Sequence, residues 1–169
     1  MGLLIINMLP EDDFEVGEAI KKISDKFDCT KVVDATTMNI KYCCGCKSCM
    51  FTTIGSCCLK DDFDKISKLI FEYKNIVVIS GASLNFLDYK TMRFFERRFS
   101  FAIKLCEFRN QNIRHICQSD LFSFGVLYKG TPDKILLNEW LKLYTDHTGD
   151  TSFGAFPIDQ VEELCECIL

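Results

Sequence analysis

The densest group of chemically reactive side chains in this sequence is a run of cysteines in its first third. Three cysteines stand at every third position, and a fourth follows after seven intervening residues: Cys43, Cys46, Cys49 and Cys57. Two-residue gaps allow successive thiolates to curl around one metal centre, and a longer return loop brings in the fourth. This spacing predicts a site for a [4Fe-4S] cluster, which takes one cysteine per iron atom.

Other interpretations of the cysteine loop stay open. The thiols can remain unligated, act as a redox pair, or close into a strained disulfide under oxidation. Cys44 and Cys58 stand beside predicted ligands and offer substitutes for them. A single zinc ion is the weaker metal hypothesis, because zinc sites more often pair two separated two-cysteine knuckles.

The composition indicates reduced thiols in one cytoplasmic domain over residues 1–169. A chain of 169 residues with 48% hydrophobic composition builds a core without disulfide staples, and its 11 cysteines are an odd number. We find no export signal and no apolar run long enough to span a membrane. The net charge of -4 argues against a nucleic-acid partner. We therefore expect neither membrane nor nucleic-acid association.

The elements that must position the cysteines alternate along the chain. Short apolar runs at 2–8, 30–35, 75–80, 122–128 and 152–156 read as strands. Amphipathic segments at 13–27, 62–73, 88–105, 131–147 and 159–169 read as helices. Right-handed crossovers then predict an α/β fold, a doubly wound parallel sheet of five strands in the order 2-1-3-4-5 with helices on both faces.

Such a sheet binds ligands beyond the carboxyl ends of its strands, where the winding reverses. The loops that reach this edge cover residues 7–13, 36–60, 81–88 and 129–132. The cysteine loop is one of them, so we expect the four predicted ligands at the rim of the sheet. The sequence assigns no catalytic residue, and we expect Arg97 to form a structural ion pair.

The cysteine loop and the acidic pair after it resemble the flavodoxin-like NAD(P)H-dependent FMN reductase family, including its iron-sulfur flavoprotein branch. The matching positions are Cys43, Gly45, Cys46, Cys49, Cys57, Asp61 and Asp62. The resemblance implies a flavodoxin-like fold, FMN as cofactor and NAD(P)H as electron donor. It also implies a homodimer or homotetramer that passes electrons to a small-molecule acceptor or a redox protein.

The resemblance, combined with the loops at the carboxyl edge, yields candidate FMN-binding residues. They are Asn7, Met8, Leu9, Pro10, Gly81, Ala82, Ser83, Leu84, Asn85, Phe86, Tyr128 and Gly130. Phe86 is a candidate for stacking on the flavin ring.

The first loop departs from the family, whose members have hydroxyl-rich residues around the FMN phosphate. Glu11, Asp12 and Asp13 would repel a phosphate, and Asp12, as a helix cap, would occupy the amides that an anion needs. Two further hypotheses therefore accompany the flavin oxidoreductase. One is an electron-carrier or redox-sensing module that uses the cysteine loop, and the other is a divergent flavodoxin-like protein that has lost FMN.

Overall fold

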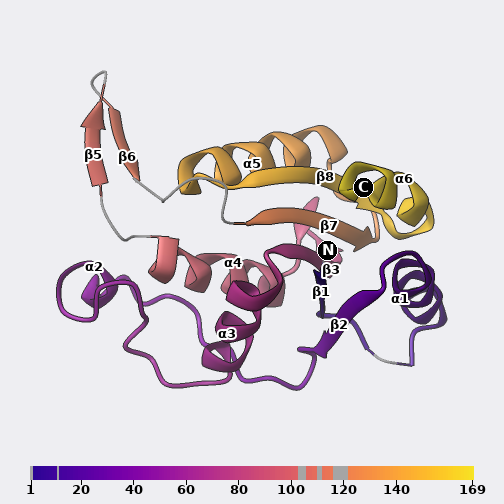
Figure 1. Cartoon of the computed structure of the whole chain (residues 1–169), viewed down its shortest axis with the longest axis horizontal. Coiled ribbons are helices and arrows are strands. Elements are labelled where there is room, and N and C mark those ends of the chain that lie inside the picture. The colour runs from indigo at the N-terminus through magenta and orange to yellow at the C-terminus, as the bar shows by residue number, and fades with distance from the viewer. Residues whose placement is uncertain (1, 11, 103–105, 110–111, 116–121) are drawn as a thin grey trace.

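A parallel sheet of five strands forms the centre of the computed structural model (Figure 1). The structure describes residues 2–10, 12–102, 106–109, 112–115 and 122–169. The side chains of residues 99, 101–102, 106–109 and 112–115 are not described. The strands are β1 (Gly2–Asn7), β2 (Cys29–Asp34), β3 (Asn75–Ser83), β7 (Ser123–Lys129) and β8 (Thr151–Pro157). Their order in space is β2-β1-β3-β7-β8, which confirms the predicted order.

Helices cover both faces of this sheet because its central strands are aliphatic on both sides. Leu4 and Ile6 of β1 pack into one hydrophobic cluster, whereas Leu3 and Ile5 pack into another. The first cluster includes buried residues of α3 (Phe63–Tyr73), α4 (Tyr89–Ala102) and α5 (Lys134–Thr148). The second includes buried residues of α1 (Phe14–Lys26), the 3-10 turn η1 (Ile158–Gln160) and α6 (Val161–Ile168). This is the doubly wound, flavodoxin-like arrangement.

The structure contains four short elements that the sequence pattern did not predict. A sixth strand, β4 (Phe86–Leu87), pairs antiparallel with the end of β3. The antiparallel pair β5 (Cys106–Arg109) and β6 (Asn112–His115) projects away from the sheet (Figure 1). The short helix α2 (Ser48–Phe51) lies inside the cysteine loop. Helix α4 ends at Ala102, and residues 103–105 of the predicted helix lie outside the described residues.

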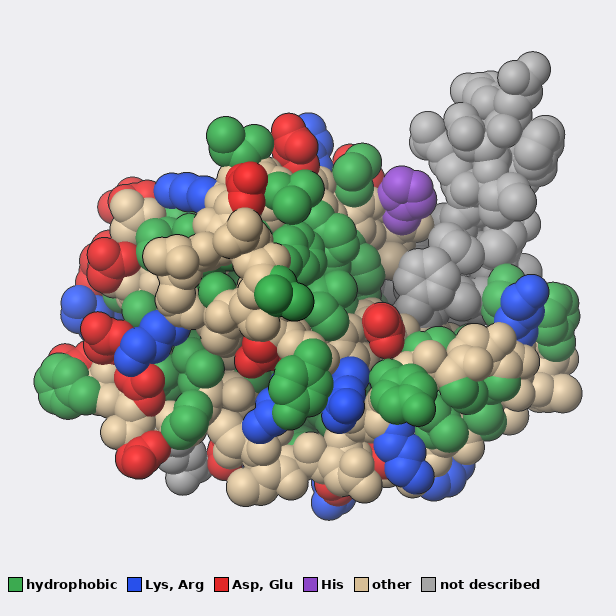
Figure 2. All heavy atoms as spheres, turned by 180° about the vertical axis from the view of Figure 1, so that it is seen from behind, with side chains coloured by type: hydrophobic (Ala, Val, Ile, Leu, Met, Phe, Trp, Pro, Cys, Tyr) green, Lys and Arg blue, Asp and Glu red, His purple; other side chains and the backbone are tan. Residues whose placement is uncertain are grey.

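The described surface mixes charges of both signs. On the face drawn in Figure 2, Lys and Arg side chains are interspersed with Asp, Glu and exposed hydrophobic side chains. Among the described residues, no helix has the combination of length and apolar character that a membrane crossing requires.

Candidate functional site

The cysteine loop is held at both of its ends by one buried guanidinium. Arg97 of α4 donates from Nη1 to the Lys41 carbonyl at 3.0 Å and to Asp61 Oδ2 at 2.5 Å. Its Nη2 donates to the Leu59 carbonyl at 3.3 Å and to Asp61 Oδ1 at 3.1 Å. Residues 41 and 59–61 are thereby brought together, and residues 42–58 form a closed loop against α4. The predicted ion pair of Arg97 is confirmed.

Asp61 is held in its ionised form by this arrangement. Burial alone would raise the pKa of Asp61, but hydrogen bonds from Arg97 and from the Lys41 and Phe63 amides lower it below its ordinary value. Burial acts to lower the pKa of Arg97, yet Asp61 and the nearby Cys57 thiol raise it above its ordinary value. The guanidinium therefore stays charged beside the cysteines.

The four predicted metal ligands share one cavity, which we call the cysteine cavity. Its volume is about 170 Å³ and its wall is almost entirely apolar or sulfur. The residues that line it are Cys43, Cys44, Gly45, Cys46, Lys47, Cys49, Met50, Cys57, Cys58, Leu59, Glu96, Arg97 and Ser100. The structure thus brings Cys43, Cys46, Cys49 and Cys57 together, and it adds Cys44 and Cys58 to the same wall.

Two residues that line this cavity each have a buried polar atom without a hydrogen-bond partner in the described part of the chain. Arg97 Nε and Ser100 Oγ are buried and unpaired among the described residues. Leaving a buried donor unpaired costs free energy, so Arg97 and Ser100 are candidates for hydrogen bonds to a bound group. Sequence reasoning missed Ser100, because a serine on an amphipathic helix carries no signal until its neighbours are known.

The thiols of the cavity differ in acidity. Hydrogen bonds from the Ser48 side chain and backbone amide, and a contact with Cys58, lower the pKa of Cys46 to about 7. Burial, together with the neighbouring Cys57 and Cys43, raises the pKa of Cys49. The Sγ atoms of Cys46 and Cys58 lie 3.5 Å apart. The pKa of Cys46 is thus lowered, whereas the pKa of Cys49 is raised.

The geometry does not favour a single metal ion. No three His, Cys, Asp or Glu side chains among the described residues converge closely enough to hold one. A mononuclear zinc site needs such convergence, so the zinc hypothesis gains no support. The same absence gives the predicted [4Fe-4S] cluster no direct support: the four cysteines line one cavity, but no group of metal ligands is formed among the described residues.

The position of the cysteine cavity differs from the expectation. Helix α4 starts at Tyr89 near the carboxyl edge of the sheet, where the Asp88 amide donates to the Gly81 carbonyl. Arg97 lies eight residues farther along, which corresponds to about 12 Å of helix. The loop that carries α2 extends away from the sheet (Figure 1). The cysteines share their cavity with Glu96, Arg97 and Ser100, so they lie beside the second half of α4 rather than at the strand tips.

The first predicted flavin loop is folded tightly on itself. Asn7 is buried, and its side chain accepts a hydrogen bond from the Leu9 amide and donates one to the Leu9 carbonyl. Met8 is buried and its amide donates to Ile79 of β3. Leu9 is half-buried, and Pro10 is exposed and has no amide hydrogen to offer. The loop therefore has few free donors.

The second predicted flavin loop is a β-hairpin. Gly81, Ala82 and Ser83 extend β3, and the turn residues Leu84 and Asn85 have φ of 51° and 61°. Leu84 is 99% exposed. This turn has no Asn-Gly or Asp-Gly pair, so the hairpin could not be predicted from the sequence. Phe86 meets the Trp140 ring edge-on at 5.2 Å between centroids and is committed to that contact.

The third loop closes against the other two. Tyr128 is buried, and Gly130 has φ 113°, a conformation that favours glycine. A Cβ at Gly130 would lie 2.9 Å from the Ala82 Cβ, and one at Gly81 would lie 3.3 Å from Leu9 Cδ2. The structure therefore brings the three predicted loops together at the carboxyl edge, where they pack on one another.

An internal ion pair occupies the helix end where an FMN phosphate would be expected. Asp13, not Asp12, caps α1 by accepting from the Glu15 amide. Lys129 Nζ lies 2.7 Å from Asp13 Oδ2 and 2.7 Å from Glu15 Oε2. The hydrogen bond from Lys129 is the main cause that lowers the pKa of Asp13. A carboxylate fills the anion position, so these residues do not fit a phosphate group.

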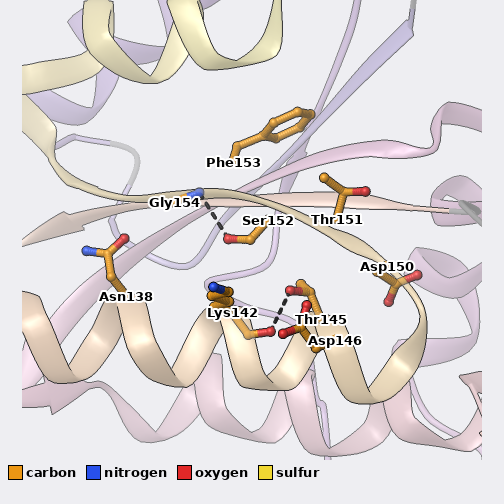
Figure 3. A pocket seen from close by; sticks show the side chains of 9 residues that line it. All are labelled: Asn138, Lys142, Thr145, Asp146, Asp150, Thr151, Ser152, Phe153 and Gly154. Carbon is orange, nitrogen blue, oxygen red and sulfur yellow. Dashed lines mark hydrogen bonds between the residues drawn. The ribbon is translucent and has the colours of Figure 1, made fainter.

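A second cavity lies between α5 and β8, outside every predicted site (Figure 3). It has a volume of about 530 Å³ and is lined by Asn138, Lys142, Thr145, Asp146, Asp150, Thr151, Ser152, Phe153 and Gly154. Its polar groups are largely satisfied from within the chain: Ser152 accepts from the Gly154 amide, and Asn138 pairs with both backbone groups of Ala155. The two buried atoms that are unpaired among the described residues, Arg97 Nε and Ser100 Oγ, belong to residues that do not line this cavity.

Comparison with known proteins shows similarity of fold to several solved structures. No family model and no curated protein matches the sequence. A putative quinone reductase from Klebsiella pneumoniae superposes with a TM-score of 0.67 at 13% identity, over 99% of this chain and 83% of the other. An azoreductase from Bacillus anthracis str. Sterne superposes with a TM-score of 0.61 at 11% identity, over 98% and 94%.

A third structure, RosB with a bound 8-demethyl-8-formylriboflavin-5'-phosphate intermediate, has a TM-score of 0.59 and 12% identity. The match covers 93% of this chain but only 64% of RosB, so the chain spans less than two thirds of that protein. At these identities the likeness concerns the fold, which is the α/β fold of flavodoxin-like reductases.

Proposed function

We propose that this chain is an electron-transfer oxidoreductase whose redox centre occupies the cysteine cavity. One observation carries the proposal. The four predicted ligand cysteines line the same cavity as Arg97 and Ser100, which each have a buried donor without a partner among the described residues. A site built only for packing would leave neither a cluster of thiols nor unpaired buried donors.

The redox centre that the cysteine spacing suggests is a [4Fe-4S] cluster. Cys43, Cys46, Cys49 and Cys57 would supply one thiolate to each iron atom. Arg97 Nε and Ser100 Oγ offer hydrogen bonds that cluster sulfurs accept. When bound, such a cluster takes up and releases single electrons.

Other residues of the cavity would hold the thiolates in place and balance the negative charge of a bound centre. Arg97 closes the loop that carries the thiolates and keeps a positive charge beside them. The apolar part of the wall lowers the local dielectric constant around a centre held here, although Cys43, Cys46 and Cys58 remain exposed to solvent. Both effects act on the reduction potential of a centre held here.

Anaerobic purification with iron and sulfide quantitation tests the proposal. We expect four iron atoms per chain and a broad visible absorbance. Cys49→Ser should remove most of the iron, whereas Cys167→Ser, which changes an exposed cysteine far from the loop in sequence, should not. Iron-free protein from anaerobic cells, or equal iron in both variants, would refute a cluster.

A second candidate is a flavin-dependent NAD(P)H oxidoreductase, as the fold of the quinone reductase and azoreductase suggests. The convergence of the three carboxyl-edge loops favours it, and the ion pair at Asp13 opposes it. In this candidate, FMN would accept electrons from NAD(P)H in a cytoplasmic homodimer or homotetramer, for a small-molecule acceptor or a redox protein.

Quenching of FMN fluorescence separates the two candidates. We expect no quenching by the unchanged chain and a gain of binding when Asp12→Ser and Asp13→Thr are combined, because the anion site is then vacated. Riboflavin, which lacks the phosphate, is the control ligand and should not respond to these substitutions. Tight FMN binding by the unchanged chain would favour the flavin candidate.

A further inference from the structure

Two thiols of the cysteine cavity are in contact with each other. The Sγ atoms of Cys46 and Cys58 lie 3.5 Å apart, although the residues are 12 positions apart in sequence. Both side chains are exposed, so a small oxidant reaches them. A disulfide bond requires the two sulfurs to approach by about 1.5 Å more.

The backbone around both residues permits this approach. Cys46 lies between Gly45 and Lys47, which have φ of 65° and 58°, and neither Cys46 nor Cys58 belongs to a helix or strand. A shift of one or two ångströms therefore breaks no helical turn and no strand pairing. The loop is nevertheless closed at its ends by Arg97, so the two thiols stay near each other.

We propose that Cys46 and Cys58 form a reversible dithiol-disulfide couple that opens and closes the cysteine cavity to metal. Cys58 falls outside the regular spacing, so the couple joins one predicted ligand to one thiol without a predicted role. The effect on metal rests on the proposed function, whereas the disulfide itself does not.

Hydrogen peroxide is the oxidant class that completes the reaction. The sulfur of one of the two cysteines attacks a peroxide oxygen, the O–O bond breaks, and a sulfenic acid and one water form. The sulfur of the other cysteine then attacks the sulfenic sulfur, forming the S–S bond and releasing the sulfenic oxygen as a second water with the thiol proton. Two electrons pass from the two thiols to peroxide, and a small dithiol reverses the step.

Peptide mapping of the full chain tests the couple. Reduced, metal-free protein is treated with one equivalent of hydrogen peroxide, blocked and cleaved after lysine. Cys46 then lies in the peptide 42–47 and Cys58 in the peptide 48–60, each with three cysteines. We expect a crosslink between these peptides that fragmentation assigns to Cys46 and Cys58, with loss of two thiols per chain and full reversal by dithiothreitol.

Matched variants decide the outcome. Cys58→Ser should abolish the crosslink, whereas Cys44→Ser should leave it intact. A dominant crosslink between other cysteines, or an unchanged crosslink in Cys58→Ser, overturns the proposal.

Iron uptake then separates the two proposals. Peroxide-treated chain should take up several-fold less iron and sulfide than the same chain after dithiothreitol, and Cys58→Ser should show a much smaller loss. If no form takes up iron, the cluster is refuted while the mapping result stands. Equal uptake by the crosslinked and reduced chains shows that the couple does not control metal.

Discussion

Arg97 and Arg98 are neighbours on α4, yet their surroundings differ in one decisive respect. Arg98 donates from Nε to Tyr144, from Nη1 to Asp150 at 2.7 Å, and from Nη2 to Thr148 and Asp150. Its guanidinium also stacks 4.3 Å from the centroid of the Phe124 ring. Every nitrogen of Arg98 has a partner, whereas Nε of Arg97 has none among the described residues.

The difference distinguishes a structural network from a site. Arg98 joins α4 to the end of α5 and the start of β8, and its complete set of partners explains its burial. Arg97 also closes a loop, but it has a buried donor that is unpaired within the described part of the chain, and it lines a cavity rich in thiols. Both arginines are buried and charged, so only the unpaired donor of Arg97 distinguishes a candidate ligand site from a structural network.

The largest effect on the free energy of unfolding is expected from substitutions of Arg98. Arg98→Ala leaves Asp150 buried without its cationic partner, and we expect it to lower the free energy of unfolding by about 3–5 kcal/mol. Urea denaturation measures the loss. Arg98→Met, which fills the volume without the charge, serves as the comparison for lost packing. Unfolding free energies within 1 kcal/mol of the unchanged chain in both variants would mean that this network is not structural.

The next largest effect tests the role of the paired contacts that the Arg97 guanidinium makes. Arg97→Lys keeps the charge but not the paired contacts with Asp61 and the Lys41 and Leu59 carbonyls. We expect a loss of about 1–3 kcal/mol in unfolding free energy and a lower iron content after anaerobic purification. Arg93→Lys, one helical turn away beside Tyr89, is the control and should leave iron content unchanged. Equal iron content in the two variants would contradict a role of the fork in shaping the cavity.

The pH dependence of stability separates the two aspartates. The pKa of Asp61 is lowered in the folded chain, so its contribution is present at neutral pH and is lost as the pH falls below about 4. Burial raises the pKa of Asp150 against the opposing effect of Arg98, so Asp150 contributes no such acid-side loss. Urea titrations from pH 7 to pH 3 should show a flatter acid limb for Asp61→Asn than for Asp150→Asn. Parallel curves would show that Arg97 does not hold Asp61 ionised.

The smallest effect on stability is expected at Ser100. Ser100→Ala removes an unpaired buried hydroxyl, so the metal-free chain should change by no more than about 0.5 kcal/mol, in either direction. In the cluster-loaded chain the same substitution should shift the midpoint potential to more negative values, because a hydrogen bond to the centre is lost. Ser67→Ala, whose hydroxyl donates to the Asp64 carbonyl, is the control for potential. An unchanged potential in Ser100→Ala would show that the hydroxyl does not reach the centre.

The sheet and the cysteine loop could be predicted from the sequence because their signals are local. The apolar runs that became β1, β3 and β7 are buried on both faces, and the handedness of the crossovers leaves few ways to arrange them. The spacing of Cys43, Cys46 and Cys49 is likewise a property of seven consecutive residues. The loop at Leu84 and Asn85 is the counterexample, since its hairpin turn uses residues without a turn signature.

Only the tertiary structure decided what surrounds the thiols and what fills the carboxyl edge. Arg97 meets Asp61 across 36 positions, and Lys129 meets Asp13 across 116. Such contacts depend on how the crossovers bring helices and loops together, which no local pattern encodes. The path of the cysteine loop along α4, the unpaired Nε of Arg97 and the contact between Cys46 and Cys58 all arise from this packing.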